Sequence, residues 1–198
     1  MNMGEEDWDI VMKVHAKGTF LCTRAGARAM KTAGNGGAII NTTSISGLAG
    51  NFGQSNYGAA KMAIYSFTKI SAMELARFGI RVNCVAPSGF TRMVATVPGA
   101  ERRAAEGEKL EDISSVIPTA RLAIYLASDL AKNLTGRVMG SHGGIKGNRI
   151  SEFKMVCSDG LQKEGGMFTL NEIADNIGKI LCPQPDIVMA SGVYQAPK

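Results

Sequence analysis

The chain has 198 residues, of which 45% are hydrophobic and 20% charged, and its formal net charge is +5 at pH 7. This length and composition favour one globular domain with an ordinary core and exclude a disordered chain. No apolar run reaches the roughly 18 residues that a membrane span needs, and the acidic opening segment lacks the basic and apolar regions of a signal peptide. We therefore expect a cytoplasmic protein with no membrane partner.

The basic residues are scattered, and Arg102-Arg103 is the only adjacent basic pair in the sequence. Nucleic-acid-binding proteins concentrate such charge on one segment or face, so we expect no nucleic-acid partner. The cysteines show no C-x-x-C spacing and the two histidines are far apart in the sequence. We interpret the cysteines as reduced packing thiols and expect no metal site.

The hydrophobic periodicity predicts helices that alternate with strands. In chain order, the expected elements are a helix over 8–32, a strand over 38–43, a helix over 56–77, a strand over 80–86, a helix near 112–128, a strand over 135–140 and a helix from Thr169 to about Ile180. The strands are nearly continuous apolar runs, which is typical of strands buried on both sides. The pattern therefore predicts an α/β fold, with a parallel sheet covered by helices on both faces.

Three polar side chains stand at spacings that suit proton transfer to a carbonyl or an alcohol. Tyr57 and Lys61 are four residues apart on a predicted helix, so they share a face. There the ammonium can stabilise a phenolate, whose ordinary pKa is about 10. Ser44 follows a predicted strand, which delivers its hydroxyl to the carboxyl edge of the sheet, the usual ligand side in open α/β folds. We predict an acid/base site centred on Tyr57.

The surrounding residues extend this pattern. The helix opens Asn-Tyr57-Gly-Ala-Ala-Lys61, and the second strand reads Ile80-Arg-Val-Asn-Cys-Val-Ala-Pro87. With Ser44, these segments resemble the short-chain dehydrogenase/reductase family. The resemblance implies a Rossmann-like, doubly wound parallel sheet, of which this chain carries the C-terminal half, with about three strands and flanking helices. It also implies hydride transfer between NAD or NADP and a hydroxy or oxo substrate.

In that family the serine orients the substrate oxygen, the tyrosine transfers the proton, and the lysine holds the nicotinamide ribose and lowers the tyrosine pKa. The resemblance assigns these roles to Ser44, Tyr57 and Lys61. After the second strand, the family's cofactor loop has Pro-Gly and a later Thr, where this chain has Pro87-Ser-Gly89-Phe-Thr91. The resemblance therefore places Pro87, Gly89 and Thr91 at the cofactor, with Thr91 against the nicotinamide carboxamide.

The family's nucleotide-binding half has no counterpart before residue 38. The sequence of a family member begins with a strand and a Gly-rich turn that binds the pyrophosphate, followed by a residue that selects NAD or NADP. We therefore expect about 90 residues, or three βαβ units, to be missing. The strand that bears Ser44 would then keep an open edge, so we expect a homo-oligomer. A truncated, non-catalytic relative that serves as a packing or oligomerisation module is the alternative to an enzyme.

His15 stands on the first helix where most of the family has an asparagine. Its imidazole either completes a proton relay with Tyr57 and Lys61, or is a helix histidine bonded to a nearby carbonyl. We expect residues 1–144 to form a partial Rossmann domain and residues 145–198 a C-terminal extension packed on it. The extension, Val14-His15 and Gly50–Tyr57 narrow the resemblance to the branch with the (3R)-hydroxyacyl-CoA dehydrogenase of multifunctional enzyme type 2 and its bacterial relatives. That branch implies a small alcohol, ketone or acyl-CoA substrate.

Overall fold

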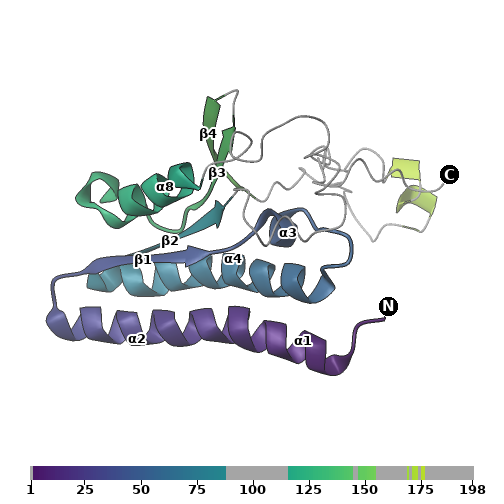
Figure 1. Cartoon of the computed structure of the whole chain (residues 1–198), viewed down its shortest axis with the longest axis horizontal. Coiled ribbons are helices and arrows are strands. Elements are labelled where there is room, and N and C mark those ends of the chain that lie inside the picture. The colour runs from purple at the N-terminus through teal and green to yellow at the C-terminus, as the bar shows by residue number, and fades with distance from the viewer. Residues whose placement is uncertain are drawn as a thin grey trace. The chain divides into compact units, whose positions relative to one another are not determined.

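The computed structural model describes residues 2–87, 116–144, 147–154, 169, 171–173 and 175–176. Contacts within the chain divide it into two units, Met1–Phe153 and Lys154–Lys198. The first unit contains the described sheet and the helices that flank it (Figure 1).

The chain begins with a long helical segment in three parts. These parts are α1 (Glu5–Val11), the π-helical segment η1 (Met12–Lys17) and α2 (Gly18–Ala33). Acidic residues fill the first turn of α1, where they oppose the positive end of the helix dipole. Gly34, at φ 75°, ends α2 and donates its N–H to the Met30 carbonyl at 3.0 Å, a conformation that glycine adopts without steric cost. The sequence predicted one helix over 8–32 and did not predict the π-helical turn.

The described strands form one sheet in the order β1-β2-β3-β4. Their bounds are β1 (Gly37–Thr42), β2 (Ile80–Pro87), β3 (Val138–Gly144) and β4 (Gly147–Glu152). The first three strands are parallel, and β4 pairs antiparallel with β3. The predicted α/β fold is confirmed as a four-strand, mostly parallel sheet with flanking helices. The estimate of about three strands was wrong because it omitted β4. The predicted strand over 135–140 begins at Val138 and extends to Gly144, where β4 supplies hydrogen-bond partners.

Helices cover both faces of this sheet. The long helices α2 and α4 (Ser55–Leu75) lie on one face, and α8 (Ile117–Ala127) lies on the other (Figure 1). On the first face, Ile64 of α4 packs on Cys84 and Val138. On the second, Leu122 and Leu126 of α8 pack on Val85. Of the helix predicted near 112–128, residues up to 115 lie outside the described part of the chain.

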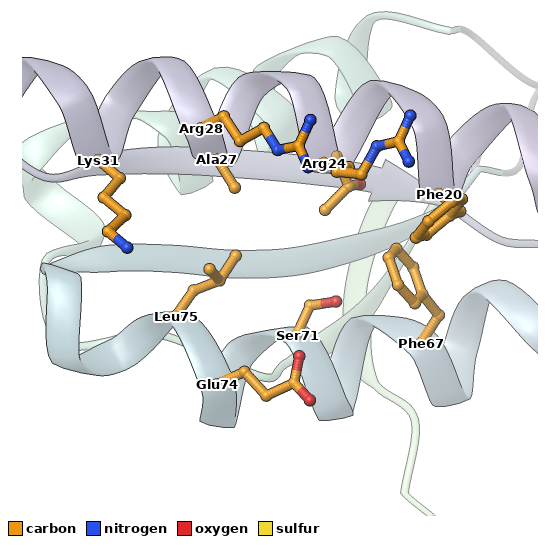
Figure 2. Close-up of a pocket in the computed structure, with 10 residues that line it drawn as sticks. Phe20, Arg24, Ala27, Arg28, Lys31, Phe67, Ser71, Glu74 and Leu75 are labelled. Atoms are coloured by element: carbon orange, nitrogen blue, oxygen red, sulfur yellow. The ribbon is translucent and has the colours of Figure 1, made fainter.

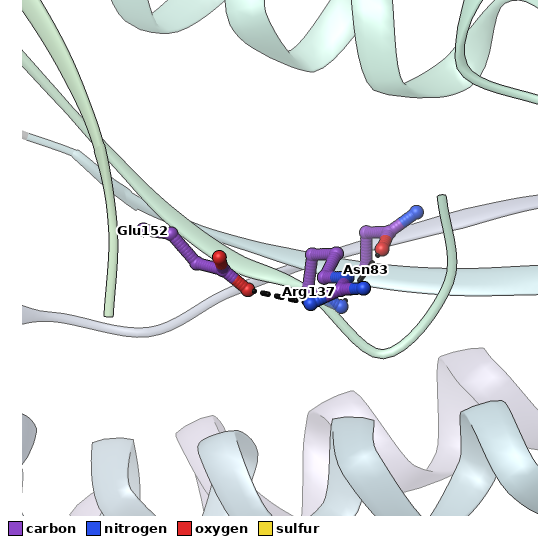
Figure 3. Close-up of polar contacts among 3 residues, drawn as sticks. All are labelled: Asn83, Arg137 and Glu152. Carbon is purple, nitrogen blue, oxygen red and sulfur yellow. Dashed lines mark hydrogen bonds and ion pairs between the residues drawn. The ribbon is translucent and has the colours of Figure 1, made fainter. Parts of the chain in front are cut away.

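Asn83 is fully buried in β2, and both ends of its amide are paired. Its Nδ2 donates to the Leu134 carbonyl at 2.8 Å, and its Oδ1 accepts from the Arg137 backbone N–H at 2.9 Å. The Arg137 guanidinium in turn meets the Glu152 carboxylate at 3.0 Å (Figure 3). Asn83 therefore ties the segment that enters β3 to the centre of the sheet, while the ion pair links it to β4.

We expect Asn83→Ala to lower the free energy of unfolding by about 2 kcal/mol, because it removes two hydrogen bonds made by a fully buried side chain. Arg137→Met is the matched control. It keeps the aliphatic stem and removes an ion pair whose arginine side chain is 46% exposed, so its cost should stay below about 1 kcal/mol. Urea titrations of the two variants measure both losses. A larger loss in Arg137→Met would contradict this account of Asn83.

Apart from Lys154, the second unit is described only at the start of its predicted helix. Thr169 donates its backbone N–H to Glu172 Oε2 at 2.7 Å, and its Oγ1 accepts from the Glu172 N–H at 3.2 Å. This reciprocal pair is the capping box that the Thr-Leu-Asn-Glu sequence indicates. Residues 171–173 and 175–176 are helical. Among the helices described in the chain, none is both long and apolar enough to cross a membrane.

Candidate active site

Ser44 lies just beyond the end of β1 and begins the short helix α3 (Ile45–Leu48). Its Oγ accepts the Ser46 N–H at 3.2 Å, and the residue is half-buried. Because β1 and β2 are parallel, their carboxyl ends meet at the same edge of the sheet. The sequence-predicted serine therefore stands at the edge where α/β folds bind ligands.

Tyr57 and Lys61 lie on the first turns of α4. The Lys61 Nζ is 5.5 Å from the centroid of the Tyr57 ring and donates to the Thr42 carbonyl at 3.0 Å. Lys61 is only 7% exposed, and burial lowers the pKa of its ammonium. Burial also raises the pKa of the neighbouring Cys84 to about 11, so at neutral pH this cysteine is an uncharged thiol. The ammonium is thus held next to the phenol in a poorly solvated place.

His15 contacts the same tyrosine from the π-helical segment η1. The ring centroids of His15 and Tyr57 are 5.3 Å apart and the planes meet at 84°, an edge-to-face arrangement. Segment η1 packs against α4, and π-helical turns occur frequently at functional sites. Burial, and then the charge of Lys61, lower the His15 pKa from 6.5. The structure therefore brings His15, Tyr57 and Lys61 together, with the imidazole neutral at pH 7.

We expect His15 to titrate below pH 6.5 in the folded chain, as measured by the imidazole proton signals in NMR. The chain has two histidines. The signal that remains in the spectrum of His142→Asn therefore belongs to His15. Because the folded state binds this proton more weakly than the unfolded state, His15 makes stability fall as the pH drops from 6.5 towards its folded pKa.

A pair of lysine variants tests the cause of that shift. Lys61→Met removes the nearby positive charge and should raise the His15 pKa. Lys69→Met removes a cation from the same helix, near Tyr65 rather than Tyr57, and should leave the His15 pKa unchanged. A His15 signal that titrates at or above pH 6.5 would show that its environment is not the one described.

The predicted cofactor loop is only partly described. Pro87 is the exposed last residue of β2, at the same sheet edge as Ser44. Gly89 and Thr91 lie outside the described residues. Their assignment to the cofactor remains a prediction.

Two glycines that sequence analysis missed allow α3 to lie directly on α4. A Cβ on Gly47 would be 2.7 Å from the Met62 nitrogen and 2.8 Å from the Lys61 carbonyl carbon. A Cβ on Gly58 would be 3.0 Å from the Ser46 carbonyl oxygen. The close approach keeps the Ser44 segment next to the turns that carry Tyr57 and Lys61. The sequence signals were a glycine three residues after Ser44 and a second glycine directly after Tyr57.

A separate cavity of about 250 Å³ lies between α2 and α4. Figure 2 shows Arg24, Arg28 and Lys31 on α2, with Phe67 and Glu74 on α4 across from them. None of the predicted site residues lines this cavity. It is therefore a feature distinct from the Ser44–Tyr57–Lys61 site.

The site residues fit one half of a nicotinamide dinucleotide. The poorly solvated Lys61 ammonium suits a ribose hydroxyl, and the half-buried Ser44 and Tyr57 suit a substrate oxygen beside it. The described residues do not fit the pyrophosphate, because its binding requires a Gly-rich turn between a strand and a long helix. Among the described residues, β1 is followed by the four-residue helix α3, and no such turn is present.

The mostly parallel sheet with flanking helices matches the structures of short-chain dehydrogenases, and the hydroxyl, phenol and ammonium groups lie near its carboxyl edge. A family model described as Enoyl-(Acyl carrier protein) reductase matches residues 1–146. The chain belongs to the short-chain dehydrogenase/reductase family.

Its curated relatives include the (3R)-3-hydroxyacyl-CoA dehydrogenase of Mus musculus, which is 39% identical over 73% of this chain and 57% of its own length. The 3-oxoacyl-acyl-carrier-protein reductase of Thermotoga maritima is 40% identical over 73% of this chain and 59% of its own length. The chain thus spans less than two thirds of the length of these relatives.

Solved structures agree with this assignment. A short chain dehydrogenase from Mycobacterium avium superimposes with a TM-score of 0.73 at 34% identity, covering 98% of this chain and 63% of its own. Full-length peroxisomal multifunctional enzyme type 2 from Drosophila melanogaster gives a TM-score of 0.68 at 28% identity, covering 90% of this chain and 30% of its own. The predicted resemblance to the hydroxyacyl-CoA dehydrogenase branch is confirmed.

Proposed function

We propose that the chain carries the proton-transfer part of an NAD(P)-dependent oxidoreductase site that acts on a hydroxy or oxo carbon, with a 3-hydroxyacyl thioester as the favoured substrate. The observation that supports this most is that two basic residues lie near the Tyr57 ring, whose centroid is 5.5 Å from the Lys61 Nζ and 5.3 Å from the centroid of the His15 imidazole. The names of its relatives, 3-hydroxyacyl-CoA dehydrogenases and a 3-oxoacyl carrier-protein reductase, support the substrate class.

In the proposed reaction, each residue handles the substrate oxygen or its proton. When bound, NAD or NADP supplies the hydride acceptor or donor. Tyr57 removes the proton of the substrate hydroxyl as the carbon loses its hydride, and returns it in the reverse direction. Ser44 orients the same oxygen by a hydrogen bond, and Lys61 holds the ribose. His15, neutral at pH 7, passes the proton between Tyr57 and solvent.

The test is a nicotinamide absorbance assay on residues 1–198 joined to a nucleotide-binding half of the family. The substrates are (3R)-3-hydroxyacyl-CoA, its 3S enantiomer and simple secondary alcohols. We expect the 3R thioester to be oxidised with at least about tenfold higher kcat/KM than the others. Turnover of simple alcohols but not thioesters would contradict the substrate class. A complete lack of turnover with hydroxy substrates would contradict the proposed oxidoreductase activity.

The non-catalytic module remains the second candidate, because the chain spans 57% of the mouse relative and the described residues hold no pyrophosphate turn. The coding sequence upstream of Met1 distinguishes the two. An in-frame strand followed by a Gly-rich turn would favour the enzyme.

We also propose that the chain forms homo-oligomers. In the described sheet, β1 pairs only with β2, which leaves its other edge available. Exposed apolar side chains also stand on the long helices, including Val14, Ile70 and Met73.

We expect light scattering to show a dimer or a larger species for the purified chain. Met73→Lys, at a position 72% exposed on α4, should weaken this association, since it places a charge among the exposed apolar side chains. The matched control is Ile124→Lys, at a position 68% exposed on α8 and on the other face of the sheet. A stable monomer for the unmodified chain would contradict the proposal.

A further inference from the structure

The end of β1 holds Lys61 at two points. The Thr43 hydroxyl donates to the Lys61 backbone carbonyl at 2.6 Å, and Thr43 is 1% exposed. The preceding residue, Thr42, offers its carbonyl to the Lys61 ammonium at 3.0 Å. Two successive residues of the strand end thus bind the main chain and the side chain of the same lysine.

The Thr43 contact is not part of the regular helix. A carbonyl in the interior of an α-helix accepts its main-chain bond from the residue four positions later, so the Thr43 hydroxyl adds a second donor to Lys61. Thr43 is itself fixed to the sheet, because its N–H donates to the Val85 carbonyl at 2.9 Å. A continuous hydrogen-bonded path therefore runs from β2 through Thr43 to the helix turn that carries Lys61.

Gly47 brings the chain back against the same turn. Its missing side chain lets α3 lie against the backbone of Lys61 and Met62. Ser44 stands between these two contacts, three residues before Gly47 and one after Thr43. The position of Ser44 relative to the Tyr57–Lys61 pair is thus determined where the strand end meets α4.

We propose that Thr43 is a positioning residue of this site. Its buried hydroxyl locks the α4 turn that bears Lys61 to the end of β1, and so sets the spacing between Ser44 and the Tyr57–Lys61 pair. Thr43 acts through Lys61. We call the hydrogen bond from the Thr43 hydroxyl to the Lys61 carbonyl the lock. Its effect on catalysis rests on the proposed function, whereas the hydrogen bond itself is a property of this chain.

The test uses three variants of the full chain. Thr43→Val removes the hydroxyl and keeps the shape, and Thr43→Ser keeps the hydroxyl. Thr68→Val is the matched control. Thr68 is a buried threonine of α4, the helix that carries Lys61, and its Oγ1 accepts from Asn41 Nδ2 of β1 at 3.0 Å. It breaks a comparable link between α4 and β1 and leaves the contacts of Thr42 and Thr43 with Lys61 in place.

The readout is the Lys61 pKa, measured by NMR on protein labelled with ¹³C-lysine and assigned with Lys61→Arg. In the unmodified chain we expect it below 10.5. Releasing the turn in Thr43→Val should let water reach the ammonium and raise the pKa by about half a unit or more. Thr43→Ser and Thr68→Val should keep the original value.

An unchanged Lys61 pKa in Thr43→Val would overturn the proposal, as would an equal rise in Thr68→Val. Should Thr43→Val fail to fold, Thr43→Ala removes the same hydroxyl without new bulk and takes its place. If neither folds, Thr43→Ser decides, because a raised Lys61 pKa in that variant would overturn the lock and an unchanged one would support it.

A second readout connects the lock to catalysis. In the active fusion, Thr43→Val should lower kcat by about tenfold and move the pH profile with the Lys61 pKa, and Thr43→Ser should restore both. If no form of the protein turns over a hydroxy substrate, the proposed function fails while the NMR comparison still decides the lock. If turnover is normal in Thr43→Val, the lock has no catalytic consequence.

Discussion

Replacing Tyr57 by Phe should lower turnover by about 100-fold or more, in a polypeptide that joins residues 1–198 to a nucleotide-binding half. The change removes the group that takes and returns the substrate proton, and general acid/base catalysis contributes on this scale. The ring itself stays, so its contacts with His15 and Lys61 are kept. Steady-state kinetics should therefore show the loss in kcat, with little change in the affinity for the reduced cofactor.

A second tyrosine provides the control. Tyr65 lies two turns further along α4, is 5% exposed, and has the Lys69 ammonium 5.8 Å from its ring. Tyr65 thus lies on the same helix as Tyr57 and also has a lysine ammonium near its ring, but it does not lie at the carboxyl edge of the sheet. Tyr65→Phe should keep turnover near that of the unmodified protein. Near-normal turnover in Tyr57→Phe would exclude the role proposed for Tyr57.

Residues 1–198 by themselves should bind NAD(H) only in the millimolar range or more weakly. Ser44, Tyr57, Lys61 and the loop that begins at Pro87 would reach only the nicotinamide half. In the family, the pyrophosphate rests on a helix N-terminus after a Gly-rich turn that this sequence does not contain. The missing charge-assisted hydrogen bonds would contribute about 1.5–3 kcal/mol each. Losing a few of them moves a micromolar Kd to millimolar.

Titration calorimetry on the purified chain measures this affinity directly. Joining a nucleotide-binding half to the same residues should return the Kd to micromolar, which separates a missing phosphate site from a damaged nicotinamide site. Micromolar binding by residues 1–198 would show that other residues of this chain hold the phosphates.

The sequence was most informative where chemistry and spacing coincide. Tyr57 and Lys61 fall on one helix face by their four-residue spacing, and Ser44 follows an apolar strand, so their convergence could be predicted. Strand β4 could not, because Gly-Asn-Arg-Ile-Ser-Glu lacks apolar alternation and is strand only through its pairing with β3. The contact of Thr43 with Lys61 was equally hidden, since neither threonine of Asn-Thr-Thr-Ser is marked by the sequence as the one that faces the helix.

The π-helical turn was unpredictable for a related reason. Met-Lys-Val-His-Ala-Lys contains ordinary helix-forming residues, and nothing local distinguishes a wide turn from a regular one. The geometry depends on packing against α4, a contact between segments distant in sequence. The approach of His15 to Tyr57 followed from that packing and could only be proposed by resemblance.

That wide turn also determines how the long helical segment would respond to a change in its length. A π-helical turn takes in more residues than an α-helical turn, so it resets the angular phase between the residues before it and those after it. Upstream, the Asp7 carbonyl accepts from Asn56 Nδ2 at 2.9 Å, and downstream Thr23 Oγ1 donates to Asn41 Oδ1 at 3.2 Å. Deleting one residue between Met12 and Lys17 would leave an α-helical turn in place of the wide one, so the two ends would nearly keep their relative orientation. Deleting one residue from the α-helical part that follows, between Gly18 and Thr23, would instead turn the two ends by about 100° relative to each other, so only one of the two contacts could be kept.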